Sequence, residues 1–521
     1  MQLSLYDTTL RDGAQTEGIS FSADDKLRIA ERLDAYGIHY IEGGFPGSNP
    51  KDREFFVQAA ERDWLSARIT AFGATRYKDT AVSDDENLQA LLGCHTPTVT
   101  IVAKFSKFQV ETVLETTPAE NLAMIRDSVA YLKRAGREVI VDAEHYFDGI
   151  TCDRAYAGEC VRAASEAGAD WLVLCDTNGG SLPSQIRAGT VAASAWTDLP
   201  LGVHTHNDID MAEANAVVGI EAGARQIHGT VNGLGERCGN ANLLTLVPTL
   251  QLKLGHGCVR PEQLQQTAVL ARYVAELANV TLDPQMPFVG HSAFAHKAGY
   301  HGSGMSKHES AYQHIDPALV GNNSRIVISE LAGRSSVVAK ADALGLRHVT
   351  DARQVVSKLK SLEERGFQFE GAEASFELLV HRLAPDYQPP FEFVDFLVLA
   401  ETREGREMLS EAMVKIRVGD EVFHTAAEGN GPVSALDRAA RKAMEQFFPE
   451  LAGMHLADYK VRILDSSAAT DAAVRVLIQS SDGMDEWGTV GSSSNIIEAS
   501  WIALQDSYEY ALMRARRRGS A

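Results

Sequence analysis

The sequence of 521 residues lacks the marks of a secreted or membrane-bound protein. It holds only six cysteines, with no Cys-x-x-Cys pair and no regular spacing, which argues against a disulfide framework and favours reduced thiols. Its N-terminus has neither the basic nor the apolar region of a signal peptide. No stretch approaches the roughly 18 apolar residues of a membrane span. We therefore expect a soluble, cytoplasmic protein without a membrane partner.

Positive charge is also scarce. The 49 lysines and arginines face 70 aspartates and glutamates, which gives a net charge of −21 and an isoelectric point near 5.2. Such a surface repels nucleic acid, so no nucleic-acid partner is expected. An anionic substrate would need local positive charge from a metal ion, an arginine or a helix N-terminus.

A short apolar strand followed by a helix repeats from residue 3 to about residue 255. Glycine follows the last turn of several helices, as at Gly37, Gly136 and Gly223. Eight such units predict a (β/α)8 TIM barrel. A doubly wound open sheet is the alternative, although no Gly-x-Gly-x-x-Gly turn follows the first strand. The expected strands are Leu3–Thr8, His39–Phe45, Arg68–Thr75, Val99–Phe105, Val139–Tyr146, Trp171–Thr177, Leu201–Asn207 and Gln226–Val231.

Two histidines stand close together in the stretch Leu201-Gly-Val-His-Thr-His-Asn-Asp208. On a strand, residues i and i+2 point to the same face, so His204 and His206 would aim their rings at one point. Imidazole is a common ligand of divalent transition metals. The pair therefore indicates part of a metal site, and the alternative is two histidines at a solvated strand end.

Polar side chains recur where the expected strands end, which favours the metal site because barrel enzymes place their chemistry at the carboxyl ends of the strands. These polar residues are Arg11 and Asp12 after the first strand, Glu42, Lys104, Glu144 and Thr177 at later strand ends, and the loop Asn232–Asn240 after the eighth strand.

Val102 and Asp142 share the inward face of Lys104 and Glu144, and they are expected to bound a substrate pocket.

Asp12 with the two histidines would leave coordination positions open for a bidentate 2-oxo acid, whose carbonyl the cation would polarise. Arg11 can stabilise the same oxygen, or can form a structural ion pair with a glutamate.

Two further residues and one loop each have two possible roles. Glu144 is a candidate general base or an orienting group. Thr177 can bind a substrate carboxylate or simply end its strand. The Asn232–Asn240 loop can bind phosphate or bring Asn240 to the metal.

The rest of the chain breaks the alternation. Residues 288–302 hold three histidines and are either a linker or a lid that adds His301 and Tyr312 to the site. Two similar strand–strand–strand–helix units follow the Pro-rich junction 384–390, and they are either plain packing units or a duplicated small-molecule sensor. We expect a catalytic barrel at 1–255, helical linker and lid subdomains at 256–385, and a C-terminal α+β regulatory domain at 386–521.

Three motifs in this order resemble the signatures of the 2-isopropylmalate, homocitrate and citramalate synthase family. They are Asp7-Thr-Thr-Leu-Arg-Asp-Gly-Ala-Gln15, His204-Thr-His-Asn-Asp208 and Asn232-Gly-Leu-Gly-Glu-Arg-Cys-Gly-Asn240. The resemblance extends over nearly the whole chain, and Gly429–Asp437 is similar to part of that family's regulatory dimerisation domain. It implies a homodimer.

The resemblance also implies a role for each candidate residue. Asp12, His204, His206 and Asn240 would hold a divalent cation (Mg²⁺, Mn²⁺, Zn²⁺ or Co²⁺). Arg11 would stabilise the oxyanion, Glu144 would help to deprotonate the acetyl methyl group, and Thr177 would contact the 2-oxo acid carboxylate. His301 and Tyr312 would complete the acetyl-CoA half, although the Gly-Ser-Gly-Met-Ser-Lys stretch after His301 departs from the acidic turn of some relatives.

The implied reaction is a Claisen-type condensation of acetyl-CoA with pyruvate, followed by thioester hydrolysis. It would serve isoleucine synthesis through 2-oxobutanoate, with isoleucine as feedback effector. The alternatives are the same reaction on 3-methyl-2-oxobutanoate, in leucine synthesis, and a metal-dependent lyase. The donor set also suits a non-haem iron oxygenase.

Overall fold

The computed structural model describes residues 3–47, 49–296, 304–305, 308–326, 352–402, 409–464, 472–483 and 485–519. The chain divides into two compact units, one of Met1–Phe294 with Ile315–Asn323 and the other of Ala295–His314 with Ser324–Ala521. The segment 256–385, expected to hold the linker, is thus shared between both units. The division into domains at 1–255, 256–385 and 386–521 stays a prediction.

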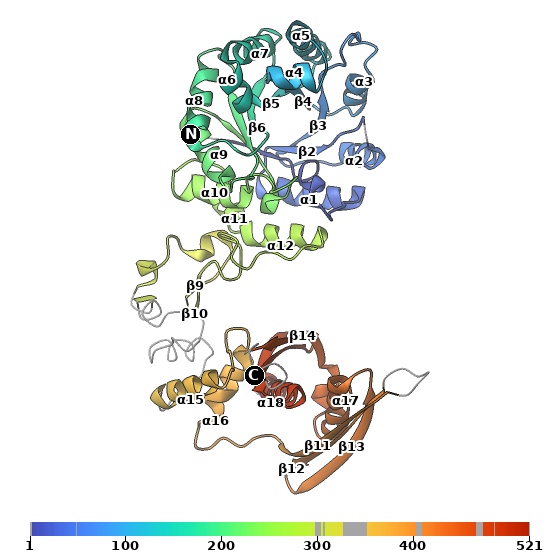
Figure 1. The fold of residues 1–521 in the computed structure, drawn as a ribbon, viewed down its shortest axis with the longest axis vertical. Coiled ribbons are helices and arrows are strands. Elements are labelled where there is room, and N and C mark those ends of the chain that lie inside the picture. The colour runs from blue at the N-terminus through green and yellow to red at the C-terminus, as the bar shows by residue number, and fades with distance from the viewer. Residues whose placement is uncertain are drawn as a thin grey trace. The chain divides into compact units, whose positions relative to one another are not determined.

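The first unit is a closed parallel barrel, which confirms the predicted fold (Figure 1). Strand β1 pairs with β2 on one side and with β8 on the other, which closes the sheet. The strands match the expected ones to within one or two residues at each end. They are β1 (Ser4–Asp7), β2 (Tyr40–Gly44), β3 (Arg68–Ala74), β4 (Thr98–Lys104), β5 (Glu138–Glu144), β6 (Trp171–Asp176), β7 (Leu201–Thr205) and β8 (Gln226–Gly229).

Helices surround the barrel and bury its outer face (Figure 1). Several begin at side-chain caps, such as Ser22 before α1 and Thr117 before α5, whose hydroxyls accept backbone N–H groups of the first turn. The helices are α1 (Ala23–Tyr36), α2 (Pro50–Ala60), α3 (Glu86–Gly93), α4 (Lys107–Thr112), α5 (Pro118–Arg134), α6 (Tyr146–Cys152), α7 (Arg154–Glu166), α8 (Pro183–Ser194), α9 (Ala212–Glu221) and α10 (Leu243–Leu252), with short 3₁₀ turns η1 (Gly13–Gln15) and η2 (Val231–Gly233).

The apolar spacing over Glu262–Ala278 predicts a helical stretch, and the structure divides it into two helices, α11 (Pro261–Leu264) and α12 (Thr267–Leu277). The hydroxyl of Thr267 donates to the carbonyl of Leu264 at 2.5 Å, so that a local side-chain bond satisfies an oxygen that a continuous helix would use. Apolar periodicity runs through both pieces and therefore hides the break.

The second unit contains two antiparallel three-stranded sheets, each followed by a helix, as the sequence predicts. The first has β11 (Glu392–Glu401), β12 (Leu409–Val418), β13 (Glu421–Gly429) and α17 (Pro432–Met444). The second has β14 (His455–Ile463), β15 (Val474–Ser481), β16 (Glu486–Ser493) and α18 (Ile496–Gly519). One apolar core joins both sheets and both helices.

Two further helices, α15 (Ala352–Glu364) and α16 (Glu373–Arg382), complete this unit. Arg382 on α16 lies between the carboxylates of Asp506 and Glu509 on α18, at 2.8 and 2.5 Å. Short elements of the unit are β9 (Ala295–His296), β10 (Arg325–Ile326), η3 (Glu309–Ala311) and η5 (Pro449–Gly453), and η4 (Pro317–Val320) belongs to the barrel unit. Among the described helices, each is too short or too polar to cross a bilayer.

We expect a buried ion pair to hold the loop after β2 in place. Lys26 and Asp52 are 4% and 5% exposed, and their side chains form a close pair. The Nζ of Lys26 also donates to the carbonyl of Gly43 at 3.1 Å, and Asp52 accepts from the backbone N–H of Phe45 at 2.8 Å. Lys26→Met would leave the carboxylate of Asp52 buried without its cation and should lower the free energy of unfolding by about 3–5 kcal/mol.

Urea unfolding of the variant measures this loss. Arg28→Met is the matched control, because Arg28 pairs with Asp24 on the same helix at the solvated surface, with side chains 57% and 62% exposed. Its removal should cost less than about 1 kcal/mol. Equal losses in both variants would contradict the assignment.

Candidate metal centre and active site

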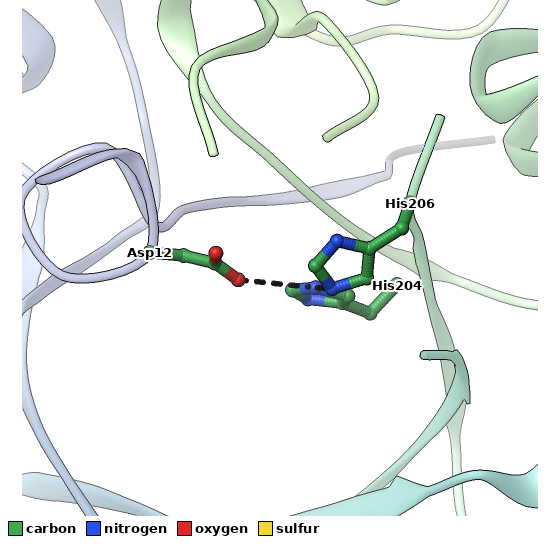
Figure 2. A group of neighbouring side chains, drawn as sticks. All are labelled: Asp12, His204 and His206. Atoms are coloured by element: carbon green, nitrogen blue, oxygen red, sulfur yellow. Dashed lines mark hydrogen bonds and ion pairs between the residues drawn. The ribbon is translucent and has the colours of Figure 1, made fainter. Parts of the chain in front are cut away.

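Three expected ligands meet at the mouth of the barrel. Asp12 comes from the turn after β1, while His204 lies on β7 and His206 directly follows it. The Oδ2 of Asp12 is 3.4 Å from the Nε2 of His204, which is itself 3.4 Å from the Nε2 of His206. Figure 2 shows the carboxylate and both rings pointing toward one another. All three side chains are buried, at 3–7% exposure.

This geometry fits a divalent cation. Ligand atoms bound at about 2.1 Å from a metal lie about 3.0–3.4 Å apart in octahedral or tetrahedral coordination. Asn240 sits opposite His206 in an isolated bridge and is 2% exposed, and its Oδ1 is buried without a hydrogen-bond partner among the described residues. An unpartnered buried amide oxygen on a residue bridged to His206 suits the expected role of a further ligand for a cation of mixed nitrogen and oxygen preference.

The electrostatics give Asp12 and His206 the protonation states that a metal ligand needs. Burial alone would raise the pKa of Asp12, but Arg11 and then His204 hold it well below its usual range. Burial, followed by repulsion from His204, lowers the pKa of His206 to about 4. Burial would also lower the pKa of His204, yet its contact with Asp12 raises it. Near neutral pH the site therefore offers an ionised Asp12 and a neutral His206.

Arg11 is fixed beside the metal ligands. Its Nε donates to the Oε1 of Glu42 at 2.6 Å, its Nη1 lies 3.5 Å from Asp12, and its guanidinium lies over the ring of Phe72 at 3.9 Å. The other oxygen of Glu42 accepts the hydroxyl of Tyr6 at 2.6 Å. The ion pair with Glu42, left open by the sequence, is thus present. Even with these contacts, 15% of the side chain of Arg11 is exposed.

Glu144 and Thr177 also lie at strand ends. Glu144 ends β5 and forms a close ion pair with Lys104 at the end of β4, and both side chains are about one-fifth exposed. The Oγ1 of Thr177 accepts the backbone N–H of His145 at 2.8 Å. Its hydroxyl hydrogen stays available to a substrate oxygen. The sequence placed Lys104 at a strand end but gave it no role.

Two of the predicted site residues, His301 and Tyr312, come from the segment expected to form a lid. His301 lies outside the described residues. Tyr312 is described, with 38% of its surface exposed, and belongs to the second unit. Their predicted roles remain predictions.

A buried polar layer beneath the ligands holds groups that the sequence analysis did not connect. Asp142 on β5 is 4% exposed and His228 on β8 is 1% exposed. Burial, with the nearby Glu42 carboxylate, raises the pKa of Asp142 to about 7. His228 stacks on Tyr6 with ring centroids 3.8 Å apart. The one sequence signal for this layer is a polar residue at an inward position of an otherwise apolar strand.

Comparison with known proteins agrees with this architecture. Residues 2–273 match the family model described as HMGL-like, residues 288–366 match the homocitrate synthase post-HMGL domain-like model, and residues 370–512 match the LeuA allosteric (dimerisation) domain. The chain is 50% identical to the (R)-citramalate synthase of Aquifex aeolicus, over 99% of this chain and 98% of that protein.

Two other relatives show the range of sequence identity. The (R)-citramalate synthase of Synechocystis sp. is also 50% identical, over 98% of this chain and 96% of that protein. A probable 2-isopropylmalate synthase of Methanopyrus kandleri is 31% identical, over 96% of each chain.

A parallel barrel with an aspartate–histidine cluster at the carboxyl ends of its strands defines the class as a barrel enzyme. The chain belongs to the HMGL-like family, in the group that holds the (R)-citramalate synthases, and it is an acyltransferase.

The first motif supplies a test of how burial affects stability. Asp7 is fully buried, and its carboxylate accepts the backbone N–H and the hydroxyl of Thr9 at 2.9 and 2.8 Å. Burial outweighs these bonds and raises the pKa of Asp7 from 3.8 to about 7. Between these values the unfolded chain releases the proton and the folded chain keeps it. The free energy of unfolding should therefore fall as pH rises through this window, by up to about 4 kcal/mol.

Asp7→Asn should lack this decline, so its stability relative to the parent should increase from pH 4 to pH 7. Urea unfolding of both proteins at several pH values measures the difference. Asp25→Asn is a contrasting control, because a bond from Ser22 lowers the pKa of Asp25 from 3.8, so that its contribution changes only at more acidic pH and its curve should run parallel to that of the parent from pH 4 to pH 7. Parallel curves for the parent and Asp7→Asn would contradict the expectation.

Proposed function

We propose that this enzyme condenses acetyl-CoA with pyruvate to give (R)-citramalate and CoA, with a divalent cation held by Asp12, His204, His206 and Asn240. The observation that carries the proposal is the convergence of the first three ligands beside Arg11 in a chain 50% identical to (R)-citramalate synthases. A bound cation would supply Lewis-acid polarisation of the 2-oxo group.

The protein's own residues provide the remaining chemistry. Thr177 donates its hydroxyl hydrogen to the carboxylate of pyruvate and fixes its orientation. Arg11, held by Glu42, directs its guanidinium to the oxygen on which negative charge develops. Because this arginine is already fixed, little reorganisation is needed when the charge appears.

Glu144 acts as the base that removes a proton from the acetyl methyl group, and its ion pair with Lys104 fixes its position. A carbon–carbon bond then forms between the methyl carbon and C2 of pyruvate, and the former carbonyl oxygen takes up a proton. Water cleaves the thioester, so that the products are citramalate and the free thiol of CoA. His301 and Tyr312 remain proposed contributors on the acetyl-CoA side.

Pyruvate is preferred over 3-methyl-2-oxobutanoate as the acceptor in this proposal. The identity to the probable 2-isopropylmalate synthase is 31%, against 50% for two (R)-citramalate synthases. The two acceptors differ only in the bulk of an apolar side chain, and each methylene is worth about 1–3 kcal/mol in discrimination.

A thiol-release assay tests the reaction. With acetyl-CoA present, pyruvate should give at least about tenfold faster release than 3-methyl-2-oxobutanoate. A chelator should abolish release, and added Mn²⁺ should restore it. Asp12→Asn should lower the rate at least about 100-fold because one anionic ligand is lost, whereas Asp210→Asn, which alters an exposed carboxylate on the loop after β7, should leave it unchanged.

Faster turnover of the branched acid would replace the citramalate proposal by the 2-isopropylmalate alternative. Cleavage of citramalate without net condensation would favour a lyase.

We further propose that the enzyme is a homodimer regulated by isoleucine through its second unit, which matches the LeuA allosteric (dimerisation) domain over residues 370–512. Isoleucine should lower thiol release in a concentration-dependent manner, and leucine should have a much weaker effect. Sedimentation of the full chain should give twice the mass of one 56.5 kDa chain. A rate unchanged by isoleucine would contradict the regulatory proposal without affecting the reaction.

A further inference from the structure

A second cluster of buried groups lies beneath the metal ligands. It consists of Asp142 on β5, His204 on β7 and His228 on β8, each of which places a possible ligand atom within 4.8 Å of the others. His204 and His228 are register partners on adjacent strands, and their rings meet edge to face with centroids 5.6 Å apart. The Oδ1 of Asp142 lies 3.9 Å from the Nδ1 of His228.

Three polar atoms of this cluster are buried and have no hydrogen-bond partner within the described part of the chain. They are the Nδ1 of His204, the Nδ1 of His228 and the Oδ1 of Asp142. An unpartnered buried polar group costs about 1–3 kcal/mol. Three such atoms in one place are complementary, because a carboxyl group can bond to both rings.

The outer nitrogens of both rings are already committed. The Nε2 of His204 faces Asp12 and His206, so a cation there would use this lone pair and place the ring hydrogen on Nδ1. The Nε2 of His228 lies 3.0 Å from the side-chain amide of Gln226, whose Nε2 is buried without a partner among the described residues. With this amide nitrogen turned to the ring, Gln226 donates to the Nε2 of His228, and the ring hydrogen stays on Nδ1 on the side of Asp142. The stacked ring of Tyr6 holds His228 in this orientation.

The charges near the centre support the same arrangement. Arg11 contributes one positive charge, whereas Asp12 and Glu42 contribute one negative charge each. A divalent cation would leave this buried group with a net positive charge. An ionised Asp142 would reduce the excess, and a bound cation favours the ionised form of a nearby carboxyl group.

We propose that Asp142 is a positioning residue of the metal centre, which accepts the Nδ1–H of His204 and is held on its other side by His228. Histidines that bind metals commonly donate their second N–H to a carboxylate, which fixes the ring and increases its basicity. The inference rests on the proposed metal site and adds a group that supports one of its ligands. A purely structural Asp142 would fill the same space without affecting the cation.

Cation affinity distinguishes these two roles. Asp142→Asn keeps the shape of the side chain and removes its charge, and it should weaken Mn²⁺ binding to the metal-free full-length protein by about 10–100-fold. The free Mn²⁺ signal in electron paramagnetic resonance measures this affinity without a turnover assay. The thermal unfolding midpoint, recorded in parallel, shows whether each variant is folded.

Two further variants complete the experiment. His228→Phe keeps an aromatic ring on Tyr6 but removes both ring nitrogens, so it should weaken Mn²⁺ binding by a smaller factor. Asp34→Asn alters a buried carboxylate that accepts the backbone N–H of Ala67 at 2.8 Å, at the amino end of β3. It should lower stability and leave the Mn²⁺ affinity of the parent intact.

Parental Mn²⁺ affinity in a folded Asp142→Asn variant would overturn the inference. If that variant does not fold, parental affinity in His228→Phe would overturn it equally. Failure of the proposed function has a different signature, because the parent protein would then bind no Mn²⁺ and Asp12→Asn would change nothing.

Discussion

The buried charge at the mouth of the barrel is the constraint on which the rest of the site depends. Asp12 and Glu42 are almost fully buried carboxylates, and an isolated buried charge is too costly to persist without a partner. Arg11 contacts both of them, and two imidazoles face Asp12 from the end of β7, two strands away around the barrel. The buried charges are compensated only if these five side chains come together, and three of them form the proposed cation site.

Barrel closure brings them together. Strand β1 pairs with β8 as well as with β2, and β7 pairs with β8, so the turn after β1 lies close to residues some 190 positions downstream. Parallel strands all end at the same rim, which places Lys104, Glu144 and Thr177 at that rim too. Lys104, Glu144 and His204 lie on strands, so the ladder of backbone hydrogen bonds fixes their positions, while Asp12 and His206 lie in the turns that follow their strands.

Much of this could be predicted because it is encoded in local periodicity. Strand positions follow from apolar runs between helical repeats, and His204 and His206 share a face because strand side chains alternate. The same rule placed Asp142 and Glu144 on one inward face. Helical periodicity, in contrast, could not show the break at residues 265–266. The apolar spacing continues across α11 and α12, while the side chain of Thr267 replaces a helical backbone bond.

Sequence alone thus determined the barrel, the second α+β unit and the identity of the candidate ligands, since these depend on neighbours along the chain. Only the tertiary structure decided that Arg11 pairs with Glu42, that Glu144 pairs with Lys104, and that His228 lies beside His204. These contacts join different strands across the barrel interior. Alternation tells which side chains point inward, but strand order, stagger and the competition for buried hydrogen bonds decide which of them meet.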